Sequence, residues 1–428
     1  MKLDSPLRIR SFLVLNPLHY TCRLDPYMTI TNYFRTTQLF IFFVLLVLLP
    51  LRDIDGIINV LMALSLIALI PDYRNLYLTR FVLGFWALFA TWYLASSLWN
   101  LFPGHTYKGL RKEVLYSVIC FIISFFSALR LKSLRSLLYA VLLSLTLSIL
   151  ASLADGGGVC WIGFMEKYHP SVGDGSTSLV FFFATALILF YVKKKYLALL
   201  AIIITVSCVG LALYHERRVI FITFAVMVIF YLLYGHKSQV MSRKAKLIGL
   251  TGMITFFLLS LIFALSLRGG AFSIGSAVAV AKQDPRIYMW DFYIDKGLEK
   301  PVMGYGAGYN ALKSTLTFLS EFPKHFSCAD KDHAHNVFLN KWLQMGIVGI
   351  LLFVALYSSV LYKCLQSEFS DDEMLLKLLL LLIFAGFFVR SMTDDFFIRN
   401  NLLLFWLMTG FILGRAEKYA LDKPEIKE

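Results

Sequence analysis

The chain has 428 residues, of which 58% are hydrophobic and only 16% are charged. A soluble globular domain usually carries about 25% charged residues, so the composition excludes an ordinary soluble protein and indicates an integral membrane protein. The formal net charge of +14 does not indicate nucleic-acid binding. The basic residues are spread through short loops between apolar runs, where such residues set membrane topology. The first apolar run starts near Gln38, and nothing before it resembles a cleavable signal peptide.

Apolar runs that suit membrane-spanning helices recur along the whole chain. A transmembrane helix needs roughly 20 apolar residues to cross the hydrocarbon layer. The sequence therefore predicts an all-α membrane protein with about twelve spans, or ten if the two short runs at the start form a tight helical hairpin. The predicted spans are centred on residues 37–51, 57–71, 81–101, 114–129, 136–154, 177–192, 197–213, 219–234, 247–267, 337–362, 373–389 and 396–414.

The distribution of basic residues predicts the orientation of these spans. In the short loops, Lys and Arg are more than twice as frequent on the side of the N-terminus as on the other side, which predicts that both termini are cytoplasmic. The chain then divides into a cytoplasmic segment (1–36), a bundle of about nine spans (37–267), a long external loop with short helices (268–336), about three further spans (337–414) and a cytoplasmic tail (415–428).

The long external loop contains one predicted helix and one glycine-rich turn. Asp284 and Pro285 suit the N-cap and first position of a helix, and Lys300-Pro301 would end it. Its apolar centre predicts an interfacial helix. The segment Gly304–Asn310 follows a helix rather than a strand, which argues against a dinucleotide-binding loop. Two interpretations stay open for it: a turn packed against aromatic residues, or a loop whose N–H groups approach a phosphate or sugar.

Polar residues from four segments are predicted to meet on the external side. His333, His335 and Asn336 precede the apolar run Val337–Tyr362, which predicts a membrane-spanning helix. The other members of the set are Arg217, Arg218, Arg286, Arg390, Asp394 and Asp395.

Each of these residues has a structural and a functional interpretation. The arginines match phosphate geometry and keep their charge, but Arg217 and Arg218 also suit headgroup anchors. Arg286 would lie in the first turn of a helix, where free N–H groups favour an anion, or would be a solvated loop residue. His335 suits either an interfacial histidine or a general base kept neutral by nearby cations. Arg390 and Asp394, four residues apart, could simply form a salt bridge with each other.

The sequence offers little support for metals, cofactors or transport. Spacing typical of metal ligands is lacking, so we expect neither a metal nor another cofactor. Cys160 and Cys328 both fall in external loops, where a disulfide is chemically possible. A transporter would need ionisable residues within its spans, and the sequence shows almost none apart from Lys377.

Taken in this order and topology, the motifs resemble those of the bacterial O-antigen ligases, within a superfamily that also holds O-antigen polymerases. The resemblance covers roughly residues 170–415. It depends on Glu216-Arg217-Arg218, on Arg286 opening a loop helix followed by Pro301–Gly306, on His335–Leu339 followed by Gly346–Gly349, and on Gly386–Arg390. The family usually has serine or threonine before the first arginine and a small residue after it, so Arg217 and Arg218 both stay candidates.

The resemblance implies an inverting glycosyltransferase of the bacterial inner membrane with a periplasmic active site. Such enzymes move a polysaccharide from undecaprenyl pyrophosphate onto lipid A-core in lipopolysaccharide biosynthesis, without a nucleotide or a metal. It implies that His335 activates the acceptor hydroxyl and that Arg217 or Arg218, with Arg286, holds the donor pyrophosphate. Asn336, His333, Arg390 and Asp394 would support these groups or orient the acceptor. An O-antigen polymerase is the nearest alternative, and a transporter of lipid-linked glycans a distant one.

Overall fold

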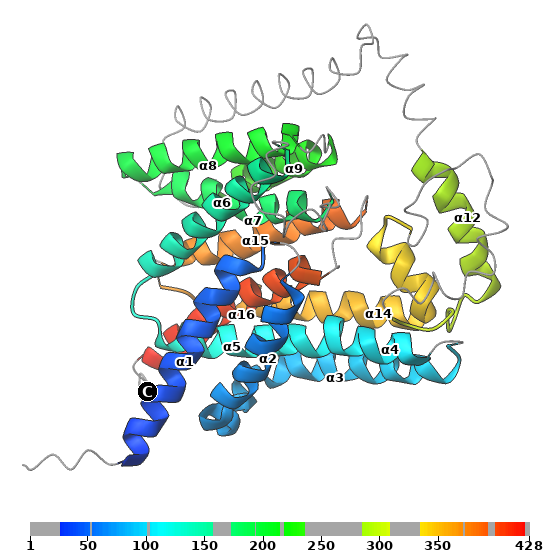
Figure 1. Cartoon of the computed structure of the whole chain (residues 1–428), viewed down its shortest axis with the longest axis horizontal. Coiled ribbons are helices and arrows are strands. Elements are labelled where there is room, and N and C mark those ends of the chain that lie inside the picture. The colour runs from blue at the N-terminus through cyan, green and yellow to red at the C-terminus, as the bar shows by residue number, and fades with distance from the viewer. Residues whose placement is uncertain are drawn as a thin grey trace, which may run out of the picture.

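The computed structural model describes residues 26–51, 54–100, 103–156, 173–192, 194–214, 218–235, 285–308, 334–370, 373–392 and 399–423, and these ranges are helical with short connections. The helices are α1 (Pro26–Leu48), α2 (Asp55–Ala68), η1 (Ile70–Thr79), α3 (Arg80–Ala95), η2 (Ser96–Leu98), α4 (Pro103–Gly109), η3 (Leu110–Leu115), α5 (Tyr116–Arg130), α6 (Arg135–Gly156), α7 (Gly173–Tyr191), α8 (Lys195–Tyr214), α9 (Arg218–Gly235), α12 (Pro285–Glu299), α14 (Val337–Gln366), α15 (Met374–Ser391) and α16 (Arg399–Asp422). Figure 1 shows their arrangement.

The all-helical membrane architecture that the sequence predicts is confirmed for the described residues, which contain no strand. Seven of their helices are long and apolar enough to cross a membrane, and three shorter apolar helices accompany them. Every predicted span overlaps a described helix except 247–267, which lies outside the described residues. The total of twelve spans and the membrane side of each loop stay predictions.

The centre of the bundle is the close crossing of α5 and α16. Gly410 and Gly414 lie one turn apart on α16. A Cβ added at Gly410 would come within 2.2 Å of Phe121 O, and one added at Gly414 within 2.3 Å of Phe125 O. Small residues at this spacing let two helix backbones approach closely in a membrane. Beside this crossing, the Trp406 ring contacts Trp86 with ring centroids 4.7 Å apart. The core is thus built from close backbone contact and aromatic packing.

Polar contacts sort the helix ends into two groups at opposite ends of the bundle. One group, here called the His335 end, includes Lys112 bonded to Asp55 at 2.6 Å and Asn400 Nδ2 donating to Leu51 O at 2.7 Å. The opposite end includes Arg130 with Asp72 and Arg415 with Glu373. α2, α5 and α16 therefore each begin near the His335 end and finish near the opposite end.

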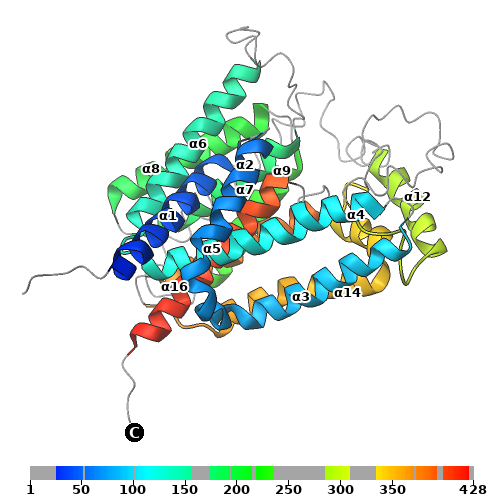
Figure 2. The same cartoon turned by 60° about the horizontal axis from the view of Figure 1, so that its bottom comes forward.

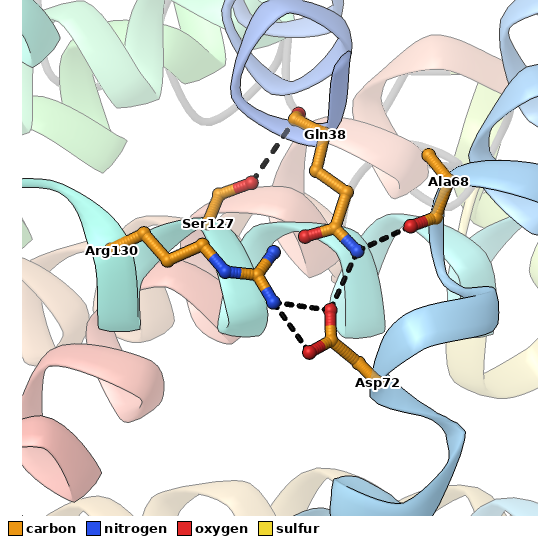
Figure 3. A network of polar contacts seen from close by, with 5 residues as sticks. All are labelled: Gln38, Ala68, Asp72, Ser127 and Arg130. Atoms are coloured by element: carbon orange, nitrogen blue, oxygen red, sulfur yellow. Dashed lines mark hydrogen bonds and ion pairs between the residues drawn. The ribbon is translucent and has the colours of Figure 1, made fainter. Parts of the chain in front are cut away.

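A buried polar network holds the opposite end together (Figure 3). The Arg130 guanidinium of α5 bonds both carboxylate oxygens of Asp72 in η1. Gln38 of α1, which is fully buried, donates to Asp72 Oδ2 at 2.7 Å and to Ala68 O at 2.6 Å. A buried charge is tolerated when it is paired and hydrogen-bonded, so this network joins α1, η1 and α5 without leaving Asp72 uncompensated.

Candidate functional site

The helix that follows His335 is broken, which corrects the prediction of one continuous span from Val337 to Tyr362. Gly346 adopts φ 65° and ψ −168° inside α14, so residues 337–345 form a separate half-helix that meets the longer part at an angle (Figure 1). A Cβ at Gly346 would lie 1.9 Å from Val302 O. Glycine is required because this backbone is strained for other residues and because the connection after α12 packs directly against it.

The glycine-rich segment after α12 satisfies the carbonyl groups that the break leaves without helical partners. Tyr305 N donates to Leu343 O and Gly306 N donates to Gln344 O, both at 2.8 Å. The Trp92 indole donates to Met345 O at 3.0 Å. Since the last carbonyls of any helix need such partners, the segment and the break depend on each other.

These bonds decide between the two interpretations of the glycine-rich segment. Beyond Tyr305 and Gly306, Gly304 N donates to Lys300 O at 3.0 Å and Ala307 N donates to Ser96 Oγ at 2.8 Å. The backbone amides from 304 to 307 are therefore engaged within the protein and are not offered to a phosphate. Residues 304–307 are thus a packed turn, and positive φ at Gly304 and Gly306 explains their glycines. Residues 309–310 of the segment lie outside the described residues.

His335 has an uncommon backbone that its neighbours hold in place. Its φ is 47°, and it is the one non-glycine with positive φ in the described part of the chain. Immediately before it, Ala334 N donates to Asn340 Oδ1 at 2.8 Å, and Ala334 O accepts from Trp290 Nε1 at 2.8 Å. A residue with a Cβ persists in this region only where the surroundings determine it, commonly at functional sites.

Asn336 connects the half-helix to the end of α15. It is the N-cap of α14, where its Oδ1 accepts from Leu339 N at 3.1 Å, as Asn commonly does. Its Nδ2 donates to Met392 O at 3.2 Å, and the rings of Phe338 and Phe388 make an edge contact with centroids 6.0 Å apart. The structure therefore brings His335 and Asn336 next to the turn of α15 that contains Arg390.

Arg390 is more deeply buried than a residue that contacts the acceptor glycan would be. Only 2% of it is exposed, and it lies in the last turn of α15. This burial favours the expectation that Arg390 braces neighbouring groups over the expectation that it touches the acceptor glycan. Its predicted partner Asp394 lies outside the described residues, as does His333.

The predicted loop helix is present as α12 and packs against the half-helix. Arg286 occupies its first turn, directly after Pro285, although nothing is described of the Arg286 side chain. Tyr293 is fully buried at the contact, and Trp342 Nε1 donates to Pro301 O at 3.1 Å. Figures 1 and 2 both show α12 beside the start of α14 at one end of the bundle. These contacts show that α12 and the segment after it are packed against the half-helix.

Of the predicted site residues, the two arginines at the start of α9 have the fewest described contacts. Arg218 is the first residue of α9, but its side chain is not described, and Arg217 lies outside the described residues. α9 runs beside α15, where a Cβ at Gly386 would come within 2.8 Å of Met227 Sδ. That these arginines reach His335 stays a prediction.

A buried ion pair at the His335 end was not anticipated from the sequence. Lys341 Nζ of the half-helix lies 2.7 Å from Glu113 Oε2 of η3, a π-helical turn, and their side chains are 7% and 13% exposed. Lys341 lies within the predicted span 337–362, so it is an ionisable residue inside a span in addition to Lys377. Asp72, Arg390 and Arg415 are also buried, but they lie just beyond the ends of the predicted spans. Lys341 four residues into an apolar run was a visible signal, but its partner 228 positions away was not.

Metal binding and disulfide pairing receive no support from the described residues. They contain no group of three or more His, Cys, Asp or Glu side chains that could hold a metal ion. Cys120, Cys208 and Cys364 are buried and reduced. Cys160 and Cys328, whose pairing was considered, lie outside the described residues.

Comparison with known proteins relates the central part of the chain to polysaccharide ligases. Residues 178–354 match the family model described as O-Antigen ligase. A Rickettsia conorii protein that is provisionally named a polysaccharide ligase is 25% identical over 142 residues, covering 33% of this chain and 32% of that protein. The chain thus matches only about a third of the length of this relative. The matched range includes Arg217, Arg286 and His335 but ends before Arg390. Residues 178–354 of this helical membrane protein are therefore similar to the O-antigen ligase family.

Proposed function

We propose that this protein is an O-antigen ligase of the bacterial inner membrane, which transfers a polysaccharide from undecaprenyl pyrophosphate to lipid A-core on the periplasmic side. The observation that supports this most strongly is the structure around His335. The region that matches the ligase family contains a histidine in a strained, well-held backbone, next to the first turn of a broken helix. The residue before this histidine bonds α12, whose first turn contains Arg286. Strain held in this way commonly marks a functional site.

In the proposed reaction His335 accepts the proton of the acceptor hydroxyl while the oxygen attacks the anomeric carbon of the donor sugar. The bond from that carbon to the pyrophosphate oxygen breaks as the new glycosidic bond forms, so the configuration inverts. Arg286 and Arg217 or Arg218 stabilise the negative charge that develops on the leaving pyrophosphate. Asn336 fixes the backbone after His335, and Arg390 braces the site from α15.

The described contacts support the division between a donor side and an acceptor side. Arg286 lies at the N-terminus of α12, where the helix dipole favours an anion. Trp290, one turn further along α12, contacts the residue before His335. The donor pyrophosphate and the proposed base would therefore both lie near the N-terminal end of α12, with the anomeric carbon between them.

Complementation of defined bacterial strains tests the function. Expressed in a strain without O-antigen ligase, with compatible donor and acceptor glycans, the protein should restore a lipopolysaccharide ladder on a gel. In a strain without O-antigen polymerase it should leave only single repeat units on the core. Rescue of the second strain and not the first would establish the polymerase and exclude the ligase.

A further inference from the structure

Ala334, the residue before His335, is held from both sides by side chains of two different elements. It is fully buried, and its N–H and carbonyl bond Asn340 of the half-helix and Trp290 of α12 at 2.8 Å each. The carbonyl belongs to the rigid peptide plane that joins Ala334 to His335, so the Trp290 bond restricts the φ that His335 can adopt. The Asn340 bond fixes the preceding peptide plane and so holds Ala334 itself in place. Neither Trp290 nor Asn340 was among the residues predicted to form the site.

The two bonds act on a conformation that His335 would not adopt unaided. Positive φ is unfavourable for a residue with a Cβ, so His335 should relax towards an ordinary conformation if the constraint is lost. Asn336 restrains the following residue through Leu339 N and Met392 O. The bonds of Asn336 to the half-helix and to α15 thus restrain the chain after His335. On the other side of His335, α12 contributes a single hydrogen bond, from Trp290 Nε1 to Ala334 O.

We propose that Trp290 and Asn340 are positioning residues that set the direction of the His335 ring, and that α12 thereby couples the donor site to the base. The proposal depends on the proposed role of His335. Arg286 and Trp290 are four residues apart on α12 and so lie on the same face of the helix. A donor that binds at Arg286 acts on the same helix turn that holds the Ala334 carbonyl.

The structure supplies a matched control for the test. Trp342 also donates its indole N–H to a backbone carbonyl, that of Pro301, at 3.1 Å. It lies on the half-helix and packs against Gly297 of α12, but it does not contact the His335 segment through this bond. Trp290→Phe and Trp342→Phe each remove one indole donor from the same helix interface while keeping an aromatic ring.

The first measurement is glycan transfer by the two full-length variants in membranes at equal abundance. Trp290→Phe should lower the rate on the order of tenfold, the effect of one positioning hydrogen bond, and should shift the pH profile of the reaction. Trp342→Phe should stay within about twofold of the wild type. Equal losses in both variants would show that only the docking of α12 matters and would overturn the proposal.

The second measurement reports on His335 independently of activity. The rate at which diethyl pyrocarbonate modifies His335, followed by mass spectrometry of the purified protein, should change in Trp290→Phe and not in Trp342→Phe. Asn340→Leu, which lacks the acceptor for Ala334 N, should change it too, and Asn340→Asp, which keeps an acceptor oxygen, should restore it. An unchanged rate in Trp290→Phe would refute the positioning role.

The two measurements together separate the failure of this proposal from the failure of the proposed function. If modification of His335 changes while transfer does not, Trp290 positions the ring but His335 is not the base. If His335 is the base, Trp290→Phe should cause no further loss in a His335→Ala background, because both act through the same group. A full additional loss in that background would contradict the coupling.

Discussion

At the scale of single residues, Gly346 and His335 show opposite uses of positive φ. Gly346 adopts it because the chain must turn there while Val302 O occupies the space of a side chain. His335 adopts it although its Cβ makes the conformation costly, because hydrogen bonds of Ala334 before it and of Asn336 after it hold the chain in place. The glycine is explained by packing alone, whereas the histidine has a cost that packing does not require, which points to function.

Replacing Gly346 tests the geometry of the break. Gly346→Ala should destabilise the protein by roughly 2 kcal/mol or more, since it adds backbone strain and a clash with Val302 O. Thermal unfolding of the purified protein in detergent measures the effect. Gly84→Ala is the control, because nothing lies within 4 Å of a Cβ at this helical position and alanine there should raise stability slightly. Equal stability of the two variants would contradict the described break.

Glu299 gives the contact between α12 and the glycine-rich segment a defined pH dependence. Hydrogen bonds from Lys296 and Tyr305 lower the pKa of Glu299 below its ordinary value of 4.5. A lowered carboxyl pKa contributes stability that is present above the ordinary value and is lost as pH falls through the folded value. Wild type should therefore be more stable than Glu299→Gln at pH 7, and the difference should vanish in acid below pH 4.5. Thermal unfolding against pH measures it, and a difference that grows in acid would be inconsistent with these bonds.

At the scale of elements, the half-helix 337–345 is the part that organises the site. It follows its N-cap Asn336, contacts Gly297 of α12 through the Trp342 ring, and is tied to η3 by the pair Lys341–Glu113. A helix of nine residues would be marginal alone in water. Its position must come from these tertiary contacts.

Breaking the ion pair from one side tests how strongly η3 holds the half-helix. Lys341→Met should cost roughly 3–5 kcal/mol, because it leaves the Glu113 carboxylate buried without its partner. The double variant Lys341→Met with Glu113→Leu should recover most of that loss, since no charge stays buried. Thermal unfolding of the single and double variants measures this. A double variant less stable than the single one would mean that the pair itself, rather than charge compensation, provides the stability.

The sequence predicted the elements of the site better than their junctions. The apolar runs located the helices at every predicted span within the described residues. Asp284-Pro285 together with Lys300-Pro301 predicted α12 closely. The break at Gly346 could not be predicted, because the apolar run continues across it and its cause is the distant carbonyl of Val302. Lys341–Glu113 and Trp290–Ala334 were missed for the same reason, since nothing local in the chain identifies a tertiary partner.

At the scale of the whole molecule, the two ends of the bundle differ in what holds them. The opposite end is joined by paired charges with no described strain, such as Arg130 with Asp72 (Figure 3). The His335 end contains the broken helix, the packed glycine-rich turn and the strained histidine. The close crossing of α5 and α16 connects the two ends through a rigid core. A rigid bundle with irregular backbone gathered at one end suits a site that works at a membrane surface.

The role of His335 as the base is tested by the lipopolysaccharide ladder of a ligase-deficient strain that carries either the wild-type protein or His335→Ala. We expect a ladder with wild type and none with His335→Ala at equal membrane abundance. His105→Ala, which removes another histidine near the same end of the bundle, should keep the ladder. A ladder that persists with His335→Ala would contradict the assignment of His335 as the base.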